Sequence, residues 1–540
     1  MKKKEWEITN TSKKDVIDIL LTNRGLKTKS EKQAFLIPVH PTDIKLKDLG
    51  ISSLEVTKAI KRIKLAKKNQ EEVIIYGDYD ADGVTATAII WEALNKFGLH
   101  VLPYIPDRFK EGYGINTKSV TKLKEEKPQL KLIITVDNGI VANEAIKAVN
   151  KLGIDVIVTD HHTPNKTRPK ALAIIHTTQI AGSAVAWVLA RELGFSDGLE
   201  LTAIGTIADQ MPLTNINRSF AKYGLAALRK TKRAGLVELV EQAGVKQESI
   251  GMYEVNYIIA PRINSMGRLA HAIDSLRLLC VKDRKRARDL AQLVSKTNLE
   301  RQRIVDEVVA SALLAARGKL ADGIIFVSHE KYHEGVIGLA AGRIVEEFYR
   351  PAIVISVGAE FSKGSARSIS GFNMVSAISE HSSLLVAHGG HTMAAGFTIE
   401  TSKLDKFQKK LNKSAKKILT DEIFVRKLKI DCELNFNLIT HELAKKLKDF
   451  EPNGNGNPQP TFLTKGVEIY DIKLLGADKK HLKMKLKKDD KFLDAIGFGM
   501  AHDFKNLKKG DTIDLVYNID ENVWNGVTTL QLKMRDLRAS

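Results

Sequence analysis

Cysteine is scarce in this chain of 540 residues, and so are long apolar segments. Its two cysteines, Cys280 and Cys432, are far apart and match no metal-ligand spacing, which excludes a disulfide framework or a zinc ribbon. No run of 18 apolar residues exists, so no transmembrane helix is expected. The basic residues 1–4 are followed by Glu-Trp-Glu instead of the apolar core of a signal peptide. We therefore expect a soluble, cytoplasmic protein with no membrane partner.

Acidic residues are also fewer than basic residues in this chain. The chain has 84 Lys and Arg residues against 64 Asp and Glu residues, a formal net charge of +20. Excess positive charge attracts nucleic acid and makes its binding salt-dependent. A generally lysine-rich composition would give the same balance, so the charge favours a polyanionic partner without establishing one.

The acidic residues that are present gather at one point. Three carboxylates fall within residues 77–83, between a strand predicted at 73–75 and a helix predicted at 85–94. They are Asp78, Asp80 and Asp82. Carboxylates this close repel one another unless a cation holds them, and the carboxyl end of a strand is where α/β proteins place their active sites. The cluster predicts a metal-dependent enzyme, with a solvated acidic turn as the simpler alternative.

Two better-known metal motifs are matched only in part. The acidic cluster opens like an EF-hand loop, but the twelfth position of that loop is Ile89 instead of a bidentate Glu. Residues 329–333 fit the zinc-protease pattern, but they follow an apolar strand predicted at 323–327 and run into Gly335. Zinc proteases need both histidines on one face of a helix, so this motif is rejected.

Three further apolar segments, interpreted as strands, end in residues that can bind a metal. They are 131–136 with Asp137, 155–159 with Asp160, His161 and His162, and 203–208 with Asp209. Helices predicted at 142–151 and 183–192 lie between them, an alternation typical of a parallel sheet whose strand ends share one edge. Each histidine alone would more often be structural, but the pair beside a carboxylate favours a functional role. Carboxylates with imidazoles suit Mn²⁺ or Mg²⁺, and we predict a two-ion site of the kind that hydrolyses phosphate esters.

The order of these motifs resembles the DHH phosphoesterase superfamily. GDYDADG at 77–83, VDNG at 136–139, DHH at 160–162 and ADQMPL at 208–213 resemble its catalytic domain, and GGH at 389–391 with AAG at 394–396 resembles its companion DHHA1 domain. Further motifs resemble the RecJ-type single-stranded-DNA-specific exonucleases. These lie at 104–108, 112–114, 261–264, 267–268, 333–338, 364–368 and 524–526. The resemblance covers nearly the whole chain in the right order.

The resemblance implies roles for particular residues. The implied catalytic metal ligands are Asp80, Asp82, Asp137, His161 and Asp209, with Asp78 and His162 as further candidates beside two Mn²⁺ or Mg²⁺ ions. Asp137 would bridge the ions. The implied phosphate-binding residues are Arg108, Arg268, Ser365, Arg367 and His391, which agrees with the bidentate binding of phosphate by guanidinium groups. His333 and Trp524 are implied to contact nucleic acid, although a plain loop histidine and a core tryptophan are the alternatives.

Two positions depart from the usual pattern of the family. Asn453 stands where an aromatic residue is common, and we expect this to weaken one contact between domains. Tyr76 stands where some relatives carry a metal-binding histidine, which leaves the ligand count of the first ion open.

The length of the chain requires several domains. The fold class that we expect is α/β, with two lobes (DHH and DHHA1) joined by a long helix, and a C-terminal OB-fold β-barrel. The expected divisions are an N-terminal helical leader at 1–50, a DHH catalytic domain at 51–225, a helical region with the connecting helix at 226–320, a DHHA1 domain at 321–425 and the OB-fold at 426–540. The barrel is predicted from short strand-like segments that follow a Pro/Gly/Asn-rich stretch at 451–460.

The sequence therefore predicts a single-stranded-DNA-specific exonuclease that hydrolyses terminal phosphodiesters by a two-metal-ion mechanism, in DNA repair and recombination. The 5′ to 3′ direction comes from the resemblance alone. Expected partners are single-stranded DNA, a helicase and a single-strand-binding protein. The alternatives are a phosphodiesterase of short oligonucleotides or cyclic dinucleotides, and a DNA-binding scaffold without chemistry. The extra domains favour a longer strand, and the full ligand set disfavours a scaffold.

Overall fold

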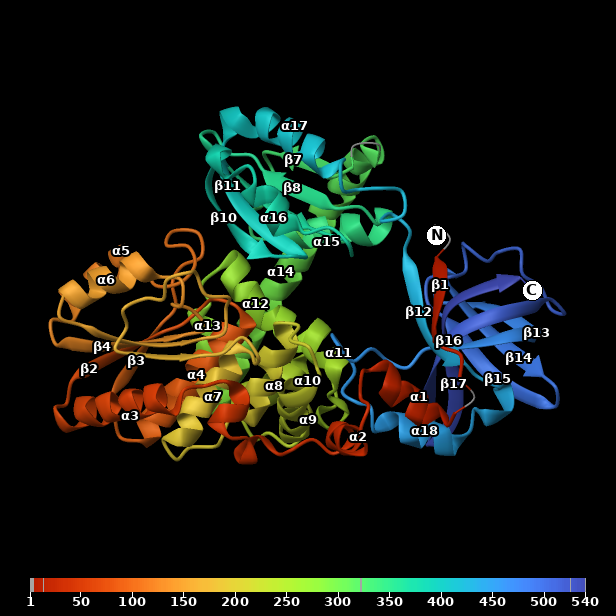
Figure 1. Ribbon diagram of the computed structural model, residues 1–540, viewed down its shortest axis with the longest axis horizontal. Helices are drawn as coiled ribbons and strands as arrows, with labels where there is room; N and C mark the ends of the chain where they lie inside the picture. Colours follow the sequence, from red (N-terminus) through yellow and green to blue (C-terminus); the bar gives the residue numbers. More distant parts are fainter. Residues whose placement is uncertain (1–3, 13, 321–322, 525, 540) are drawn as a thin grey trace.

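The residues that the structure describes form three sheets, two with five strands and one with seven (Figure 1). The computed structural model describes residues 4–12, 14–320, 323–524 and 526–539. The expected fold class is confirmed, because two α/β lobes are joined by a long helix and followed by a β-barrel. Among the described residues, no helix combines the length and the hydropathy needed to span a bilayer.

The first lobe is built on a parallel sheet of order β3-β2-β4-β5-β6. Its strands are β2 (Glu72–Tyr76), β3 (Val101–Tyr104), β4 (Leu130–Val136), β5 (Asp155–Asp160) and β6 (Ala173–His176). The central strands are apolar almost throughout, as expected where helices cover both faces of a parallel sheet. All five carboxyl ends therefore lie at one edge.

Helices cover the two faces of this sheet unequally. Helices α5 (Thr117–Glu126) and α6 (Asn143–Lys151) pack in a small core on one face. Helices α3 (Ser53–Lys68), α4 (Ala81–Lys96) and α7 (Gly182–Glu192) pack on the other face, in the largest core of the described chain. Helix α4 starts at the acidic cluster, so its first turn lies at the carboxyl edge of the sheet (Figure 1).

The segment 203–208, for which the sequence pattern predicts a strand, is the end of helix α8 (Leu199–Ala208), and that prediction is wrong. Residues 201–207 are all buried, because α8 packs between α4, α7 and α9 (Asn215–Leu228). A short continuous apolar run has the same appearance in a buried helix and in a buried strand. Asp209 still follows the end of a buried element, but that element belongs to the helical layer.

A helical region joins the two lobes. It consists of α10 (Ala234–Gln242), α11 (Met252–Glu254), a π-helix at Val255–Ile259, α12 (Ala260–Leu269), α13 (Ile273–Cys280) and α14 (Arg284–Arg317). The 34 residues of α14 make it about 50 Å long. Its first half packs on the core of the first lobe through Ala291 and Val294, and its second half packs on the second lobe through Val308 and Ala312. The helix thus holds the two lobes in a fixed relation.

The second lobe has a mixed sheet of order β10-β11-β9-β8-β7. Its elements are β7 (Ile325–His329), α15 (Ile337–Phe348), β8 (Ala352–Ser356), β9 (Phe361–Arg367), α16 (Met374–Ser379), β10 (Leu385–His391), β11 (Ala394–Glu400) and α17 (Leu404–Ala415). The rejected zinc-protease motif begins at the end of β7 and continues into a turn, as expected. Strand β9 carries alternate side chains toward the first lobe, among them Ser365 and Arg367.

The C-terminal domain is a closed barrel of order β13-β14-β15-β17-β16-β13. Its strands are β13 (Phe462–Leu475), β14 (His481–Lys488), β15 (Lys491–Gly497), β16 (Thr512–Trp524) and β17 (Val527–Ala539), preceded by β12 (Lys427–Glu433) and α18 (His441–Lys448). The parallel pairing of β15 with β17 closes an otherwise antiparallel barrel, as an OB-fold requires.

The N-terminal segment also belongs to this domain, which the predicted helical leader does not describe. Strand β1 (Glu5–Asn10) pairs in parallel with β12, and α1 (Val16–Asn23) packs into the barrel core. Helix α2 (Lys29–Leu36) then leads back toward the first lobe. The pairing of β1 is non-local, so its six-residue alternating pattern gave no sign of a partner. The predicted domain boundaries themselves stay predictions.

Candidate metal centre and phosphate cleft

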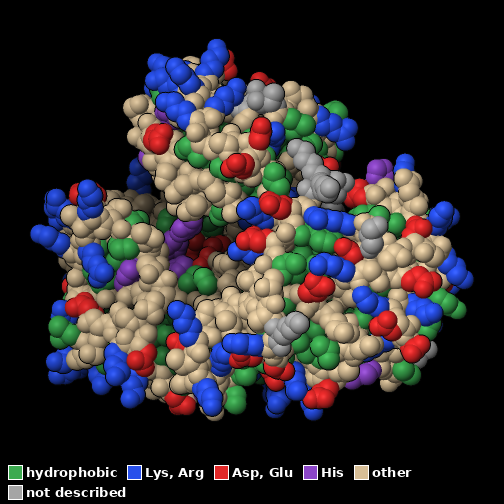
Figure 2. Space-filling model, turned by 45° about the vertical axis from the view of Figure 1, so that its right-hand side comes forward, with side chains coloured by type: hydrophobic (Ala, Val, Ile, Leu, Met, Phe, Trp, Pro, Cys, Tyr) green, Lys and Arg blue, Asp and Glu red, His purple; other side chains and the backbone are tan. Residues whose placement is uncertain are grey.

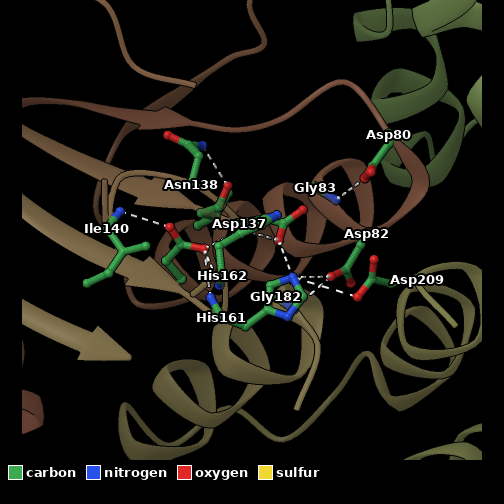
Figure 3. A network of polar contacts seen from close by, with 12 residues as sticks. Asp80, Asp82, Gly83, Asp137, Asn138, Ile140, His161, His162, Gly182 and Asp209 are labelled. Atoms are coloured by element: carbon green, nitrogen blue, oxygen red, sulfur yellow. Dashed lines mark hydrogen bonds and ion pairs between the residues drawn. The ribbon is translucent and has the colours of Figure 1, made fainter. Parts of the chain in front are cut away.

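Seven predicted ligands lie together at the carboxyl edge of the first sheet, and Figure 3 labels all of them except Asp78. Asp78 and Asp80 follow β2, Asp82 lies in the first turn of α4, Asp137 follows β4, His161 and His162 follow β5, and Asp209 follows α8. Three groups have ligand atoms within 4.8 Å of one another: Asp82, His161 and Asp209; Asp78, Asp80 and Asp137; and Asp137, His161 and His162. Residues from distant parts of the first lobe thus form one cluster of oxygen and imidazole donors.

His161 lies at the centre of this cluster. Its Nε2 is 3.1 Å from Asp137 Oδ1, 3.7 Å from Asp209 Oδ2 and 3.8 Å from Asp82 Oδ2. Asp82 is oriented by the start of α7, because its two oxygens accept hydrogen bonds from the backbone N–H groups of Gly182 and Ser183, at 2.7 and 3.0 Å. A carboxylate at a helix N-terminus is favoured by the unpaired backbone donors there.

Asp137, like His161, is shared by two of the three groups, and its role as a bridge between two ions stays a prediction. Its backbone has a φ of +61°, an uncommon conformation for a residue other than glycine, and its N–H donates to the carbonyl of Thr159 at 2.9 Å. The neighbouring sheet strand therefore fixes the backbone from which this carboxylate projects. Strain of this kind is often found at functional sites.

Asp160 holds both histidines in place, a role that the sequence did not reveal. Its Oδ1 accepts hydrogen bonds from the backbone N–H groups of His161 and His162, at 2.7 and 3.1 Å, and lies 2.8 Å from His162 Nδ1. Its Oδ2 accepts from the N–H of Ile140 at 2.8 Å. Both oxygens of a buried carboxylate are thus used to fix the turn that presents the imidazoles, an outer-shell arrangement typical of metal sites.

Asn264 is a second positioning residue without a predicted role. Its Oδ1 accepts a hydrogen bond from the backbone N–H of Ala81 at 2.8 Å, which ties α12 to the acidic turn. Asn264 belongs to one of the motifs that resemble the family, but nothing in that motif shows its purpose. Only the fold shows which backbone group it meets.

The donor set fits hard divalent cations. The Oδ1 atoms of Asp78 and Asp137 are buried and accept no well-formed hydrogen bond from a described residue, although His161 Nε2 lies 3.1 Å from that of Asp137. A buried carboxylate without a partner is costly unless a cation neutralises it. Oxygen donors with imidazole match Mn²⁺ and Mg²⁺. The ring of Tyr76 is buried in the small core under α5 and α6, and its hydroxyl donates to the carbonyl of Gly114 at 3.3 Å.

Electrostatics in the cluster agree with a site for positive charge. Burial raises the pKa of Asp137 well above its ordinary value, and the charge of Asp82 raises it further. Burial likewise raises the pKa of Asp209 to about 8, assisted by Asp82 and Asp80. Burial lowers the pKa of His161, which keeps its imidazole neutral, the form in which it ligates metals.

His162 behaves differently from its neighbour. Burial acts to lower its pKa, but the hydrogen bond and charge of Asp160 raise the pKa to about 9. The ring of His391, on β10 of the second lobe, stacks against the ring of His162 with centroids 6.4 Å apart. The predicted phosphate-side histidines of the two lobes therefore meet beside the ligand cluster.

Two glycines make room for the carboxylates. A Cβ added to Gly182 would lie 2.2 Å from Asp137 Oδ1, and a Cβ added to Gly205 would lie 2.2 Å from Asp82 Oδ1. Neither distance is compatible with a side chain at these positions. The sequence gave neither glycine a role, because the contact exists only after α7 and α8 pack over the sheet edge.

A cavity of about 430 Å³ opens between the two lobes beside this cluster. Figure 2 shows histidine and acidic side chains gathered in the hollow below the upper lobe. Four of the predicted phosphate-binding residues line the cavity. They are Arg108, Arg268, Ser365 and Arg367. His333 packs edge-on against Phe109 at its margin, with ring centroids 5.9 Å apart.

The arginines of the cavity have no carboxylate partner among the described ion pairs. Arg268 donates to the carbonyl of Gly335 at 2.9 Å, and Arg367 donates to the carbonyl of Ala366 at 2.9 Å. Burial lowers the pKa of Arg268 to about 10, and the nearby charges of Arg108, Arg301 and Arg367 add to this shift. Guanidinium groups held close together without counter-charge form a site for a phosphate anion.

The prediction for Trp524 cannot be placed in this site, because its side chain lies outside the described residues. The remaining predicted residues fall into two sets that face one another. The ligand cluster lies on the first lobe, and Ser365, Arg367 and His391 lie on the second. The roles assigned to all of these residues stay predictions.

The fold and this site define a metal-dependent phosphoesterase of the DHH–DHHA1 class. Family models match residues 72–210 (DHH family, N-terminal domain), 321–417 (DHHA1 domain) and 430–536 (RecJ OB domain). The single-stranded-DNA-specific exonuclease RecJ of Bacillus subtilis is 37% identical over 536 residues, which cover 96% of this chain and 67% of that protein. RecJ of Haemophilus influenzae is 33% identical over 517 residues, 88% of this chain and 89% of that protein.

A solved structure gives the same result. The crystal structure of RecJ from Thermus thermophilus in complex with Mn²⁺ matches with a TM-score of 0.84 at 28% identity, over 99% of this chain and 80% of that chain. The same protein has a structure in complex with Mg²⁺. The chain belongs to the RecJ family.

Proposed function

We propose that the protein is an exonuclease that degrades single-stranded DNA from its 5′ end with Mn²⁺ or Mg²⁺ as cofactor. One observation carries the proposal: a cluster of residues suited to hold hard cations lies beside a cavity lined by arginines, which have no carboxylate partner among the described ion pairs. A phosphodiester held by the arginines would lie against the ligand cluster. The curated relatives that carry the name single-stranded-DNA-specific exonuclease support the choice of substrate.

Each group of residues has a defined part in this reaction. Bound ions would supply Lewis acidity and charge neutralisation to an in-line displacement at phosphorus. Asp137 would serve both ions, and Asp160 would keep the imidazoles of His161 and His162 in their orientation. Arg268 and Arg367 would hold the phosphate oxygens and stabilise the charge that develops on them. The 5′ to 3′ direction is inferred from the family resemblance.

The barrel supports a substrate longer than a dinucleotide. On its β13–β15 face, Tyr470 and Phe492 are both partly exposed and pack edge to face, with centroids 5.0 Å apart. Lys485 and Lys487 place their ammonium groups 5.6 and 5.8 Å from the ring centroid of Phe492. A basic surface with exposed aromatic rings is the arrangement by which OB-folds bind single strands.

We place this activity in the cytoplasm, in DNA repair and recombination. Single-stranded DNA arises where a duplex is unwound, and it is quickly covered by binding proteins. A helicase and a single-strand-binding protein are therefore the partners that we infer. The support for these partners is the chemistry of the substrate alone.

The test follows the length of a 3′-labelled single strand and of its blunt duplex, with Mn²⁺ and with or without a chelator. We expect the label to shorten progressively on the single strand only, and only without chelator. A strand labelled at its 5′ end should instead release label at once, which fixes the direction. Cyclic and linear dinucleotides serve as parallel substrates.

The alternatives give different results in the same assay. Cleavage of dinucleotides with no shortening of the long strand would establish the small-substrate phosphodiesterase. Binding of the strand without any cleavage, at saturating Mn²⁺, would establish the scaffold. Internal fragments from the first time points would contradict an exonuclease.

A further inference from the structure

A short turn of the barrel domain, residues 454–457, contacts the segment of the first lobe that follows Asp209. The ends of this turn pair with each other, because Gly454 N–H donates to the carbonyl of Asn457 at 2.8 Å and Asn457 N–H donates to the carbonyl of Gly454 at 3.1 Å. Asn455 and Gly456 therefore form its tip. The tip lies against residues 210–214, the segment that directly follows Asp209.

Two hydrogen bonds join the tip to that segment. The side-chain Nδ2 of Asn455 donates to the carbonyl of Gln210 at 2.7 Å. The backbone N–H of Leu213 donates to the carbonyl of Asn455 at 2.7 Å. Packing is equally close, since a Cβ added to Gly454 would lie 2.8 Å from Leu213 Cδ1. The barrel domain thus holds the segment by one side-chain hydrogen bond, one backbone hydrogen bond and close packing.

The segment needs support from outside. Gln210 has a φ of +57°, in the left-handed region where helices commonly end with glycine. A residue with a side chain keeps this conformation only where the surrounding structure holds it there. Its amide Nε2 donates to Asn256 Oδ1 at 2.7 Å, and its carbonyl is the group that Asn455 binds. Contacts with two other parts of the chain therefore maintain the backbone next to Asp209.

Asp209 itself is the most loosely held carboxylate of its ligand group. Its side chain is 34% exposed, whereas that of Asp82 is 2% exposed and is fixed by two backbone donors. The nearest described partner of Asp209 is His161, at 3.7 Å. The position of this ligand depends on the backbone that carries it.

The base of the turn is held by hydrogen bonds from Asn457 and from Arg218, so the tip has a support on both sides. Asn457 Nδ2 donates to the carbonyls of Phe450 and Pro452, at 2.7 and 2.9 Å. The buried guanidinium of Arg218, on α9, donates to the carbonyls of Asp449 and Glu451, at 2.7 and 2.8 Å. The first lobe and the barrel domain are thereby locked together directly beside the turn.

We propose that Asn455 is a positioning residue for the metal centre: it holds the segment after α8 so that Asp209 meets Asp82 and His161 as a ligand. The barrel domain then contributes to catalysis as well as to DNA binding. The inference rests on the proposed function in one respect, namely that Asp209 ligates an ion.

The test measures Mn²⁺ binding without DNA, by the loss of the free-ion electron paramagnetic resonance signal during titration. Asn455→Ala removes the side-chain donor, and Asn455→Asp replaces it with an acceptor that faces the Gln210 carbonyl. We expect both variants to bind one of two ions about tenfold more weakly than the wild type, the effect typical of outer-shell residues. Lys448→Ala, on the exposed face of α18, is the control in the same domain and should bind both ions as the wild type does.

Steady-state kinetics give an independent readout. For Asn455→Ala we expect a lower kcat at limiting Mn²⁺ that recovers at saturating Mn²⁺, with an unchanged KM for the single strand. Ion affinities within about twofold of the wild type would overturn the inference, even with a lower unfolding temperature, since the turn would then only dock the domain. A wild-type protein that bound no ion would instead overturn the proposed function, so the two failures are distinct.

Discussion

An alanine at position 182 should disable the metal centre while leaving every ligand chemically intact. Gly182 begins α7, and its N–H donates to Asp82 Oδ2 at 2.7 Å. An added Cβ would lie 2.2 Å from Asp137 Oδ1 and 2.7 Å from Asp137 Cβ. An ordinary carbon–oxygen contact is about 3.3 Å, so helix and carboxylate would have to separate by about 1 Å. Such a displacement would move Asp137 itself, and it would also move the N–H of Gly182 that binds Asp82.

The size of the effect follows from this distance. A misplacement of about 1 Å at a reacting centre costs about a hundredfold in rate. We therefore expect Gly182→Ala to lower kcat about a hundredfold and to weaken Mn²⁺ binding about tenfold, with KM for the single strand unchanged. Exonuclease kinetics and a Mn²⁺ titration of the same preparation measure the two quantities.

The control is Gly342→Ala, on the exposed side of α15, where an added Cβ meets nothing within 4 Å. This variant should keep wild-type kinetics and gain up to about 1 kcal/mol of stability from the better helix propensity of alanine. If Gly182→Ala retained kcat and Mn²⁺ affinity within about threefold of the control, the close approach of α7 to Asp137 would not govern the site.

Three more predictions concern ligands, protons and phosphate. Asp137→Asn should reduce kcat at least about a thousandfold, yet retain wild-type affinity for a single strand in Ca²⁺, measured by fluorescence anisotropy. The pKa of Asp209 is raised to about 8 in the fold, so in chelator its ionisation should lower stability as pH rises from about 4 to about 8. Asp209→Asn should remove that part of the decline in unfolding temperature, and an unchanged decline would contradict the shift. Arg268→Ala should weaken strand binding and lower its salt slope by about 0.7, whereas Arg303→Ala, ion-paired on the surface of α14, should change neither.

Local pattern sufficed for much of the fold, but not for its non-local parts. Strand ends that deposit ligands at one sheet edge follow from hydrophobic periodicity and from the rules of parallel sheets. Helix α8 was not predicted, because its buried sequence has no polar face and so does not show the 3.6-residue hydrophobic period of a helix. Strand β1 was not predicted either, because its partner is about 420 residues away, and nothing in six alternating residues specifies which sheet they join.

The candidate site shows the same division. The aspartates and histidines were predicted from residue type and position, and the structure brings all seven together. Three positioning residues were missed, because each acts on a part of the chain that only the fold brings near. Asp160 holds the two histidines, Asn264 binds the backbone of the acidic turn, and Gly182 leaves room for Asp137. Such roles appear only when the elements are packed.

The pairing of β1 with β12 has a consequence for how the protein is made. During synthesis at roughly 5–20 residues per second, β12 leaves the ribosome about twenty to eighty seconds after β1. During that interval the first α/β lobe can fold, and the second lobe emerges only shortly before β12. The edge of β1 has no partner strand until β12 emerges. A nascent chain that lacks β12 exposes the hydrogen-bonding groups of β1, which can pair with a strand of another chain. The adjacent nascent chains on the same polysome carry the same strand. Fragments that end before β12 should therefore self-associate through β1, although their catalytic lobe is complete.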